Sequence, residues 1–269
     1  MPTSPVYDTT RQQLTQKLPQ ALASQIETLA CVVVGIGFSM SAQIGKIARA
    51  MPLDTTHAAK EQRIRRLLDN ERLTQTDHYQ PLAKAALTGL KGQRVNLLID
   101  RVLVQDLHNI LVVSVGFRRR SLPLAWIALP HRGASGVPDQ QSLLRQALAV
   151  LPASVRVTIH GDSEFRSQDL FAWLRDQGHD GMLGVTGATL VALTPDGAPA
   201  ALATWLPNRD SVAYLTGVYL TEGRHGPVQV LAWWDKDDEG TLIVRAVMTN
   251  LPATWQTYRW GRRRMESFG

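Results

Sequence analysis

A chain of 269 residues, 44% of them apolar, is long enough to bury a substantial core in one large domain and a small one. Lys and Arg outnumber Asp and Glu by 29 to 23, which gives a formal net charge of +6 and a pI of about 9.8. This balance favours a polyanionic partner such as nucleic acid, although a basic globular protein without such a partner has the same composition. Cys31 is the only cysteine, which excludes a disulfide framework and a thiolate metal cage and fits a reducing cytosol.

No membrane partner is expected. The N-terminus lacks the basic-then-apolar pattern of a secretion signal. The most apolar stretch, residues 29–40, is shorter than the roughly 20 residues of a membrane-spanning helix. We therefore expect a cytoplasmic protein.

Residues 1–90 have the pattern of a compact helical module. One helix is predicted to run to residue 50 with Ser41 as its N-cap. Another spans residues 60–68 and is dense in Lys and Arg, including Arg63 and Arg66. Such density on a short helix is the charge pattern that DNA phosphates require, so we interpret the module as DNA-binding. A solvated basic helical cap is the alternative.

From residue 94 the pattern changes to strands. Three apolar or β-branched runs, at 94–104, 109–117 and 122–129, predict an antiparallel meander. A helix from Pro138 to Leu151, a fourth strand over 155–159 and a helix after Asp162 follow. This series predicts an α/β fold with an RNase H-like core, whose first part covers residues 91–180. In that arrangement the first and fourth strands are adjacent and parallel, joined by a right-handed crossover.

Residues 181–250 are strand-rich, with turn signals such as Pro195-Asp196-Gly197 between the runs. We interpret them as an inserted β-rich segment followed by the last strand of the core. Residues 251–269 are interpreted as the start of a C-terminal catalytic helix.

Two aspartates end predicted strands of this core. Asp100 follows the apolar run 95–99, and Asp162 follows the run 155–161. If the first and fourth strands are neighbours, the two carboxylates meet. Carboxylate oxygens are ligands that Mg²⁺ prefers, and two such ions can clamp the attacking and leaving oxygens of a phosphodiester. Taken singly, Asp100 is also a common turn residue and Asp162 a common helix cap.

A third carboxylate, Glu266, lies in a basic C-terminal segment. Tyr258, Arg262 and Glu266 are four residues apart each time, so they share one helical face. On that face Arg262 can bind a phosphate while Glu266 points at a metal, and Arg259 and Arg263 add positive charge. A solvated basic tail with a surface glutamate is the alternative.

Four sequence fragments occur together in this chain. They are Ile99-Asp100-Arg101, Gly161-Asp162-Ser163-Glu164-Phe165, Thr249-Asn250 and the Tyr–Arg–Glu segment. Together they resemble the DDE transposases of bacterial insertion sequences, in the subgroup with a Tyr-x2-Arg-x3-Glu-x6-Lys signature. The resemblance extends over roughly residues 11–269 and implies an RNase H-like catalytic domain with a β insertion and an N-terminal helical DNA-binding module.

The resemblance also implies specific roles. Asp100, Asp162 and Glu266 would be a catalytic triad that holds two Mg²⁺ ions, for which Mn²⁺ can substitute, and Tyr258 and Arg262 would contact DNA. The implied partner is double-stranded DNA at the terminal inverted repeats of the element, bound by a homodimer. The implied location is the bacterial nucleoid.

Phosphate contacts that position the DNA are further expected from basic residues of the core. We assign them to a basic turn between the second and third predicted strands and to the C-terminal segment. The residues are Arg119, Arg120, Arg262 and Arg263.

Two positions depart from the signature. Three residues instead of two separate Tyr258 from Arg262, and the chain ends at Gly269, before the signature lysine. We therefore expect a truncated copy or an upstream frame that is completed by frameshifting. A catalytically weak or inactive form that occupies element ends is one alternative function, and another RNase H-like DNA nuclease is a second.

Overall fold

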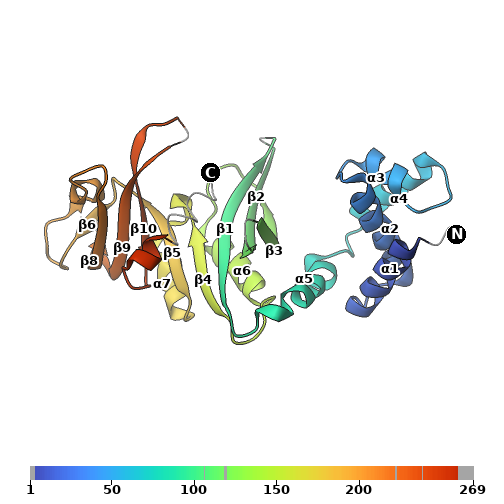
Figure 1. Cartoon of the computed structure of the whole chain (residues 1–269), viewed down its shortest axis with the longest axis horizontal. Coiled ribbons are helices and arrows are strands. Elements are labelled where there is room, and N and C mark those ends of the chain that lie inside the picture. The colour runs from blue at the N-terminus through green and yellow to red at the C-terminus, as the bar shows by residue number, and fades with distance from the viewer. Residues whose placement is uncertain (1–3, 106, 118–119, 222, 238, 260–269) are drawn as a thin grey trace. The chain divides into compact units, whose positions relative to one another are not determined.

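A computed structural model describes residues 4–105, 107–117, 120–221, 223–237 and 239–259. The chain divides into two compact units, Met1–Gly89 and Leu90–Gly269 (Figure 1). The first is helical and the second is an α/β unit built on one large mixed sheet. The boundary falls beside residue 90, where the helical sequence pattern ends.

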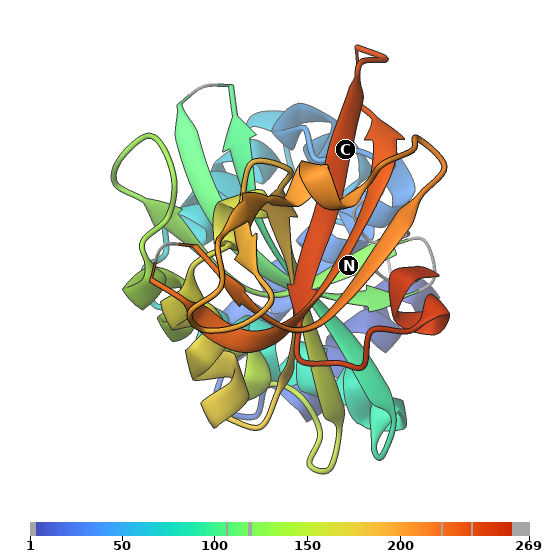
Figure 2. The same cartoon turned by 90° about the vertical axis from the view of Figure 1, so that its left-hand side faces the viewer.

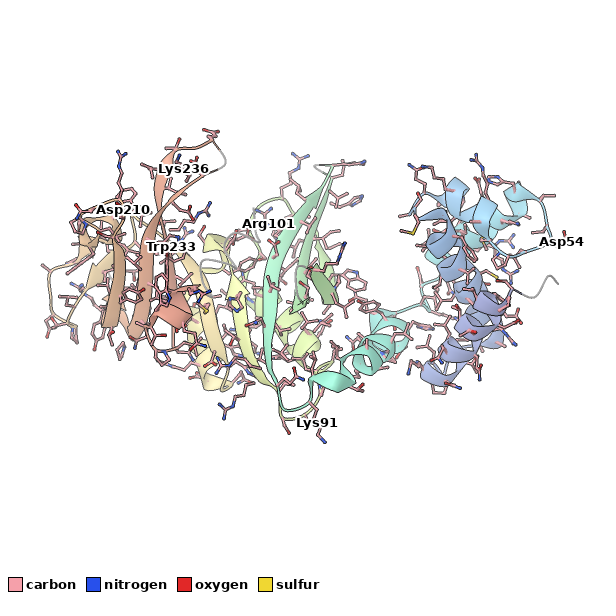
Figure 3. All side chains as sticks on the ribbon, in the orientation of Figure 1. Asp54, Lys91, Arg101, Asp210, Trp233 and Lys236 are labelled. Atoms are coloured by element: carbon pink, nitrogen blue, oxygen red, sulfur yellow. The ribbon has the colours of Figure 1, made fainter. Side chains whose placement is uncertain are left out.

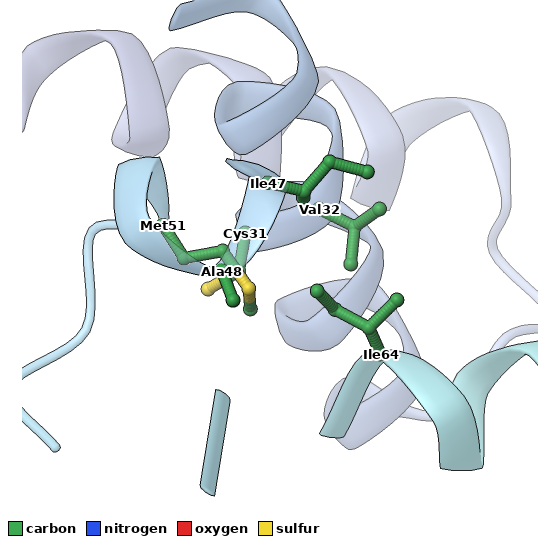
Figure 4. Close-up of a cluster of buried hydrophobic side chains, with 6 residues drawn as sticks. All are labelled: Cys31, Val32, Ile47, Ala48, Met51 and Ile64. Atoms are coloured by element: carbon green, nitrogen blue, oxygen red, sulfur yellow. The ribbon is translucent and has the colours of Figure 1, made fainter. Parts of the chain in front are cut away.

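The helical unit contains five α-helices in its described part. They are α1 (Pro5–Lys17), α2 (Ala23–Ser39), α3 (Ile44–Ala50), α4 (His57–Leu68) and α5 (Gln80–Leu87). Apolar side chains from three of these helices meet in one core cluster (Figure 4). Its buried members are Cys31, Val32, Ile47, Ala48, Met51 and Ile64. The wide apolar face of α2 therefore holds the shorter helices α3 and α4 in place.

The predicted N-cap at Ser41 is wrong. Helix α2 continues to Ser39 and ends through Met40 in the left-handed conformation, so Ser41 belongs to the connection between helices. Its hydroxyl accepts a hydrogen bond from the backbone N–H of Gln43 at 3.2 Å, and Gln43 is the N-cap of α3. The basic helix α4 begins earlier than predicted, because Thr56 caps it by accepting from the N–H of Ala59 at 3.2 Å.

Ten strands form the sheet of the second unit in its described part. They are β1 (Arg94–Val104), β2 (His108–Phe117), β3 (Arg120–Leu129), β4 (Arg156–Gly161), β5 (Asp180–Thr186), β6 (Leu190–Ala192), β7 (Ala200–Ala201), β8 (Val212–Leu220), β9 (His225–Lys236) and β10 (Leu242–Thr249). Their order is β3-β2-β1-β4-β5-β10-β9-β8-β6-β7. The α/β class is therefore confirmed.

The strand directions change across the sheet. Strands β1, β2 and β3 form the predicted antiparallel meander. Strand β4 pairs in parallel with β1, as predicted, and β5 pairs in parallel with β4. From β5 onward every pairing is antiparallel. The strands β6 to β9 therefore continue the same sheet beyond β10 instead of forming a separate layer.

Two helices supply the parallel crossovers. Helix α6 (Val137–Leu148) connects β3 to β4, and α7 (Gln168–Asp176) connects β4 to β5. The helix expected directly after Asp162 begins only at Gln168, because a 3-10 turn (Ser163–Phe165) intervenes. Both helices pack against the sheet and against each other.

Successive residues of β5 show which face each layer covers. A Cβ on Gly181 would lie 3.1 Å from the ring of Phe171, so this position faces α7. Met182, the next residue, packs with Trp233 and Tyr258 on the other face, as the two-residue period of a strand requires. The helical turn at residues 255–259 therefore lies across the sheet from α6 and α7 (Figure 2).

No single helix in the described part of the chain is long and apolar enough to cross a membrane. Helices α2 and α3 reach that length and hydropathy only together, across a bend of 99°.

Candidate active site

The parallel pairing of β1 with β4 brings the two predicted aspartates to one place. Ile99 pairs with Gly161, and Asp100 and Asp162 are the next residues of the two chains. Both carboxylates are half-buried. Beyond this point β1 pairs only with β2, where Asp100 lies opposite Val112. The site therefore lies where β4 ends and β1 continues (Figure 1).

Each aspartate also makes a local backbone hydrogen bond. The Oδ1 atom of Asp100 accepts from the N–H of Arg101 at 2.7 Å. The Oδ1 atom of Asp162 accepts from the N–H of Glu164 at 2.8 Å and so caps the 3-10 turn. These bonds fix the orientation of both carboxyl groups and leave oxygen lone pairs for other ligands. The capping interpretation of Asp162 is thus observed beside its place in the acidic pair.

The surroundings raise the pKa of both aspartates above the usual value. Burial is the main cause in each case. The nearby charges of Asp162 and Glu164 also raise the pKa of Asp100, while the N–H of Arg101 opposes this shift. For Asp162 the charge of Glu164 acts in the same sense, and the N–H of Glu164 opposes it. Clustered, half-buried carboxylates with raised pKa values are typical of a functional site.

An ion pair lies directly beside these carboxylates. The Nε atom of Arg101 donates to Oε2 of Glu164 at 2.7 Å, and the two side chains are 28% and 14% exposed. The other oxygen of Glu164, Oε1, accepts from the backbone N–H of Ser135 at 3.3 Å and from its hydroxyl at 3.4 Å. Figure 3 marks Arg101 on β1. The pair therefore connects β1 to the turn after β4.

Further hydrogen bonds extend this pair into the neighbouring elements. Asn109 on β2 accepts from Nη1 of Arg101 at 3.5 Å and donates to the carbonyls of His131 and Gly133, each at 2.9 Å. The amide of Gln140 on α6 donates to the carbonyl and to the hydroxyl of Ser135, each at 3.0 Å. The two aspartates are thus held on a polar network that spans β1, β2, α6 and the 3-10 turn.

This network is not predictable from the sequence pattern. Its members are separated by up to 63 positions, as in the pair Arg101–Glu164, and only the fold brings them together. The signal in the sequence was a charged residue close to each aspartate, Arg101 directly after Asp100 and Glu164 two residues after Asp162.

Two glycines allow the chain to pack tightly around Asp162. A Cβ on Gly184 of β5 would lie 2.7 Å from the backbone N of Ser163 and 2.8 Å from the carbonyl carbon of Asp162. A Cβ on Gly161 would lie 2.9 Å from the Cβ of Phe165. The backbone that carries Asp162 is therefore enclosed between β5 and the 3-10 turn.

The predicted C-terminal site residues are only partly described. Tyr258 is 5% exposed and packs edge-on against Trp233, with ring centroids 5.4 Å apart. Thr254 directly precedes the helical turn that carries it, and the Thr254 hydroxyl accepts from the N–H of Thr257 at 3.3 Å. Arg259 is exposed. The remaining residues, Arg262, Arg263 and Glu266, lie outside the described residues.

The other predicted DNA contacts fall in two places. Arg120 is exposed at the start of β3, while Arg119 lies outside the described residues. Arg63 and Arg66 line a cavity of about 910 Å³ in the helical unit. There the Nε atom of Arg63 donates to the hydroxyl of Thr28 at 3.0 Å.

A metal site with three side-chain ligands is not present among the described residues. No three His, Cys, Asp or Glu side chains within that part of the chain are placed to hold one ion. The two neighbouring carboxylates of Asp100 and Asp162 do provide the oxygen donors that Mg²⁺ prefers. The third expected ligand, Glu266, lies outside the described residues.

Comparisons with known proteins add no assignment. The chain matches no protein family and no curated protein.

Proposed function

We propose that this chain is a DNA transposase of the DDE type, which cleaves and transfers the strands of an insertion sequence. The observation that carries the proposal is the parallel pairing of β1 and β4, which sets Asp100 and Asp162 side by side. Burial and like charge raise the pKa values of both carboxyls, a combination that is typical of functional sites.

The strand order supports an RNase H-like core. Strands β3-β2-β1-β4-β5 contain the antiparallel meander and the two parallel strands that this core requires. Strands β6 to β9 lie between β5 and β10 in sequence and form the outer part of the sheet. We interpret them as the β-rich insertion and β10 as the last core strand.

Asp100, Asp162 and Glu266 would hold two Mg²⁺ ions in this proposal. Such ions supply charge stabilisation for the attacking and leaving oxygens of a phosphodiester. The residues of the chain bind the ions and orient the carboxylates that hold them. The local N–H donors hold the carboxylates of Asp100 and Asp162 in one orientation, and the Arg101–Glu164 pair keeps a guanidinium beside them.

The DNA would be double-stranded and would carry the terminal inverted repeats of the element. Arg63 and Arg66 in the helical unit and Arg120 and Arg259 in the second unit would contact its phosphates. Arg119, Arg262 and Arg263 complete this proposed set. Contact between DNA and Tyr258 would require its ring to leave the cluster with Trp233. A homodimer on the DNA, close to the nucleoid, completes the proposal.

The decisive experiment is cleavage of duplexes taken from the DNA that flanks the gene, with Mg²⁺ or Mn²⁺. Asp100→Asn and Asp162→Asn each keep the side-chain oxygen that accepts the local N–H but lose the charge. We expect each to lower strand cleavage by at least about a hundredfold, since a metal clamp contributes several kcal/mol. Asp210→Asn, an exposed aspartate marked in Figure 3, is the matched control and keeps parental activity.

A panel of substrates separates the proposal from its rivals. A transposase prefers one inverted-repeat end over unrelated duplexes, whereas a general nuclease cuts them equally. Binding of the repeat without any cleavage indicates a non-catalytic form that occupies element ends. Cleavage by Asp100→Asn at the parental rate would falsify the assignment of the acidic pair.

A further inference from the structure

A smaller cavity is lined by Arg166, which follows Asp162 by four residues. It has a volume of about 290 Å³ and is formed by residues that follow β4, by the end of β5 and by the chain after β8. A Cβ on Gly184 of β5 would meet the backbone of Asp162 and Ser163, and the next two residues of β5, Val185 and Thr186, line the cavity. The cavity therefore begins one strand away from the acidic pair, at the same end of the sheet.

The polar groups of this cavity are donors and neutral hydroxyls. Arg166 is its only charged lining residue, and no carboxylate lines it among the described residues. Three threonines, Thr186, Thr189 and Thr221, add hydroxyl groups, and Gln168 adds a side-chain amide. The amide of Gln168 donates to Sδ of Met248 at 3.5 Å, so the guanidinium and the hydroxyls are the groups left for a ligand. A guanidinium and hydroxyl groups in one cavity, without a competing acid, are suited to a phosphate group.

The backbone fixes these donors in place. Nη1 of Arg166 donates to the carbonyl of Ser163 at 2.8 Å, and within the described chain this is the only hydrogen bond of its guanidinium. The N–H of Thr189 donates to the carbonyl of Thr186 at 3.0 Å, which makes a tight turn between β5 and β6. Thr221 has a φ of 61° and donates its N–H to the carbonyl of Leu190 at 2.9 Å. The hydroxyls of Thr186 and Thr189 also lie 3.4 Å apart and hydrogen-bond to each other, so this turn holds both of them together.

Arg166 is also close enough to Asp162 to influence it. Its positive charge lowers the pKa of Asp162 and so opposes the effect of burial. Arg166 follows Asp162 by four residues, directly after the 3-10 turn that Asp162 caps. A phosphodiester at the acidic pair would therefore place the adjoining phosphate of the same strand near Arg166.

We infer that the cavity formed by Arg166, Gln168, Thr186, Thr189 and Thr221 binds the phosphate next to the scissile phosphodiester. This inference rests on the proposed function, which identifies the phosphate as part of a DNA strand. The cavity alone would bind a free phosphate or a nucleotide through the same groups. The apolar side chains of Val185 and Ala188 form the remaining wall, against which the sugar of that nucleotide packs. By holding this phosphate, the cavity determines which phosphodiester of the DNA strand reaches Asp100 and Asp162.

The test uses the full chain and three probes. They are inorganic phosphate, a 5′-phosphorylated trinucleotide and the element-end duplex. Backbone amide signals of Thr186, Thr189 and Thr221 report occupancy of the cavity by NMR, independently of cleavage. Arg166→Gln and Thr189→Val remove a charge and a hydroxyl, and Arg175→Gln, an exposed arginine on α7, is the matched control.

We expect the trinucleotide to shift these three signals at lower concentration than inorganic phosphate does. Arg166→Gln should abolish the shifts. A plot of the logarithm of its duplex affinity against log[salt] should have a slope smaller in magnitude by about one than the slope of the parent. Thr189→Val should weaken trinucleotide binding severalfold, and Arg175→Gln should behave as the parent. Equal shifts and equal salt slopes for Arg166→Gln and the parent overturn the inference.

The outcomes also separate this inference from the proposed function. If the parent cleaves the duplex and Arg166→Gln binds and cleaves it equally well, the cavity assignment fails while the proposed function stands. If phosphate and trinucleotide bind equally well at the cavity but no duplex is bound or cleaved, the proposed function fails. That result also overturns the assignment of the cavity to a DNA strand.

Discussion

Arg101 and Glu164 form an ion pair of 2.7 Å that joins the strand of one candidate catalytic aspartate to the turn of the other. Each partner lies close in sequence to an aspartate, Arg101 after Asp100 and Glu164 two residues after Asp162. Because the pair is mostly buried, its geometry limits how far the two carboxylates can move apart. The spacing of the acidic pair thus depends on a contact outside it.

Breaking this pair should destabilise the fold. Arg101→Met leaves three neighbouring carboxylates without their guanidinium and should lower the free energy of unfolding by about 2–4 kcal/mol. Glu164→Gln keeps the acceptor for Ser135 and should cost less, about 1–2 kcal/mol. Urea titration monitored by tryptophan fluorescence measures both values.

The double variant tests whether the effect comes from the pair. Arg101→Met with Glu164→Gln should be more stable than the sum of the single changes predicts, with a coupling of at least about 1 kcal/mol. Strict additivity of the two changes would show that Arg101 and Glu164 stabilise the protein independently.

The close approach of β5 to Asp162 predicts a sharp difference between two glycine substitutions. Gly184→Ala places a Cβ 2.7 Å from a backbone nitrogen and should cost about 1–3 kcal/mol, with a loss of cleavage. Gly37 in α2 has nothing within 4 Å of an added Cβ, so Gly37→Ala should stabilise by about 0.5–1 kcal/mol. Thermal unfolding of both variants measures the contrast, and equal midpoints would contradict the proposed enclosure of Asp162.

Much of the sheet could be predicted from the sequence, because each core strand is a continuous apolar or β-branched run. The strand over 94–104 was predicted with the observed bounds. Local sequence signals gave wrong or missing element boundaries where tertiary packing determines the secondary structure. Ser41 has the chemistry of an N-cap, but α2 continues to Ser39 and displaces the start of α3. The two-residue strand β7 is too short to leave a periodic pattern.

The candidate site was only partly predictable for the same reason. Asp100 and Asp162 could be paired because strand order alone places them together. The Arg101–Glu164 contact and the cavity at Arg166 depend on side chains that meet only in the folded chain. Tyr258 was expected at the DNA, but its ring fills a space beside Trp233 that helical spacing does not reveal.

The cluster around Tyr258 should be a large local source of stability. Tyr258→Ala empties a site that is 5% exposed and removes ring contacts with Trp233 and Tyr214, so it should cost about 3–5 kcal/mol. Trp255→Ala, at a residue that is 61% exposed, should cost below about 1 kcal/mol. Urea titration compares the two, and a small effect of Tyr258→Ala would mean that this cluster does not stabilise the unit.

The raised pKa of Asp100 predicts how its replacement depends on pH. The folded state holds this proton more tightly than the unfolded chain, whose ordinary value is 3.8, so stability falls as pH rises from about 3.8 through the raised pKa. Asp100→Asn has no proton to lose at this position and so avoids this loss of stability. We expect its thermal midpoint to exceed that of the parent at pH 7.5 and to approach it near pH 4. A constant difference across this range would contradict the shift.

Divalent cations should reverse that order of stability. Mg²⁺ that binds only the folded parent adds RT ln(1 + [Mg²⁺]/Kd) to its free energy of unfolding, about 2.7 kcal/mol at a hundredfold excess over Kd. Asp100→Asn and Asp162→Asn lack one of the two charged ligands and should gain little. Thermal unfolding at pH 7.5 with and without Mg²⁺, followed by chelation, measures this gain, and Asp210→Asn serves as the charge-matched control. An equal gain in all four proteins would place the cation elsewhere on the chain and remove the reason for grouping Asp100 with Asp162.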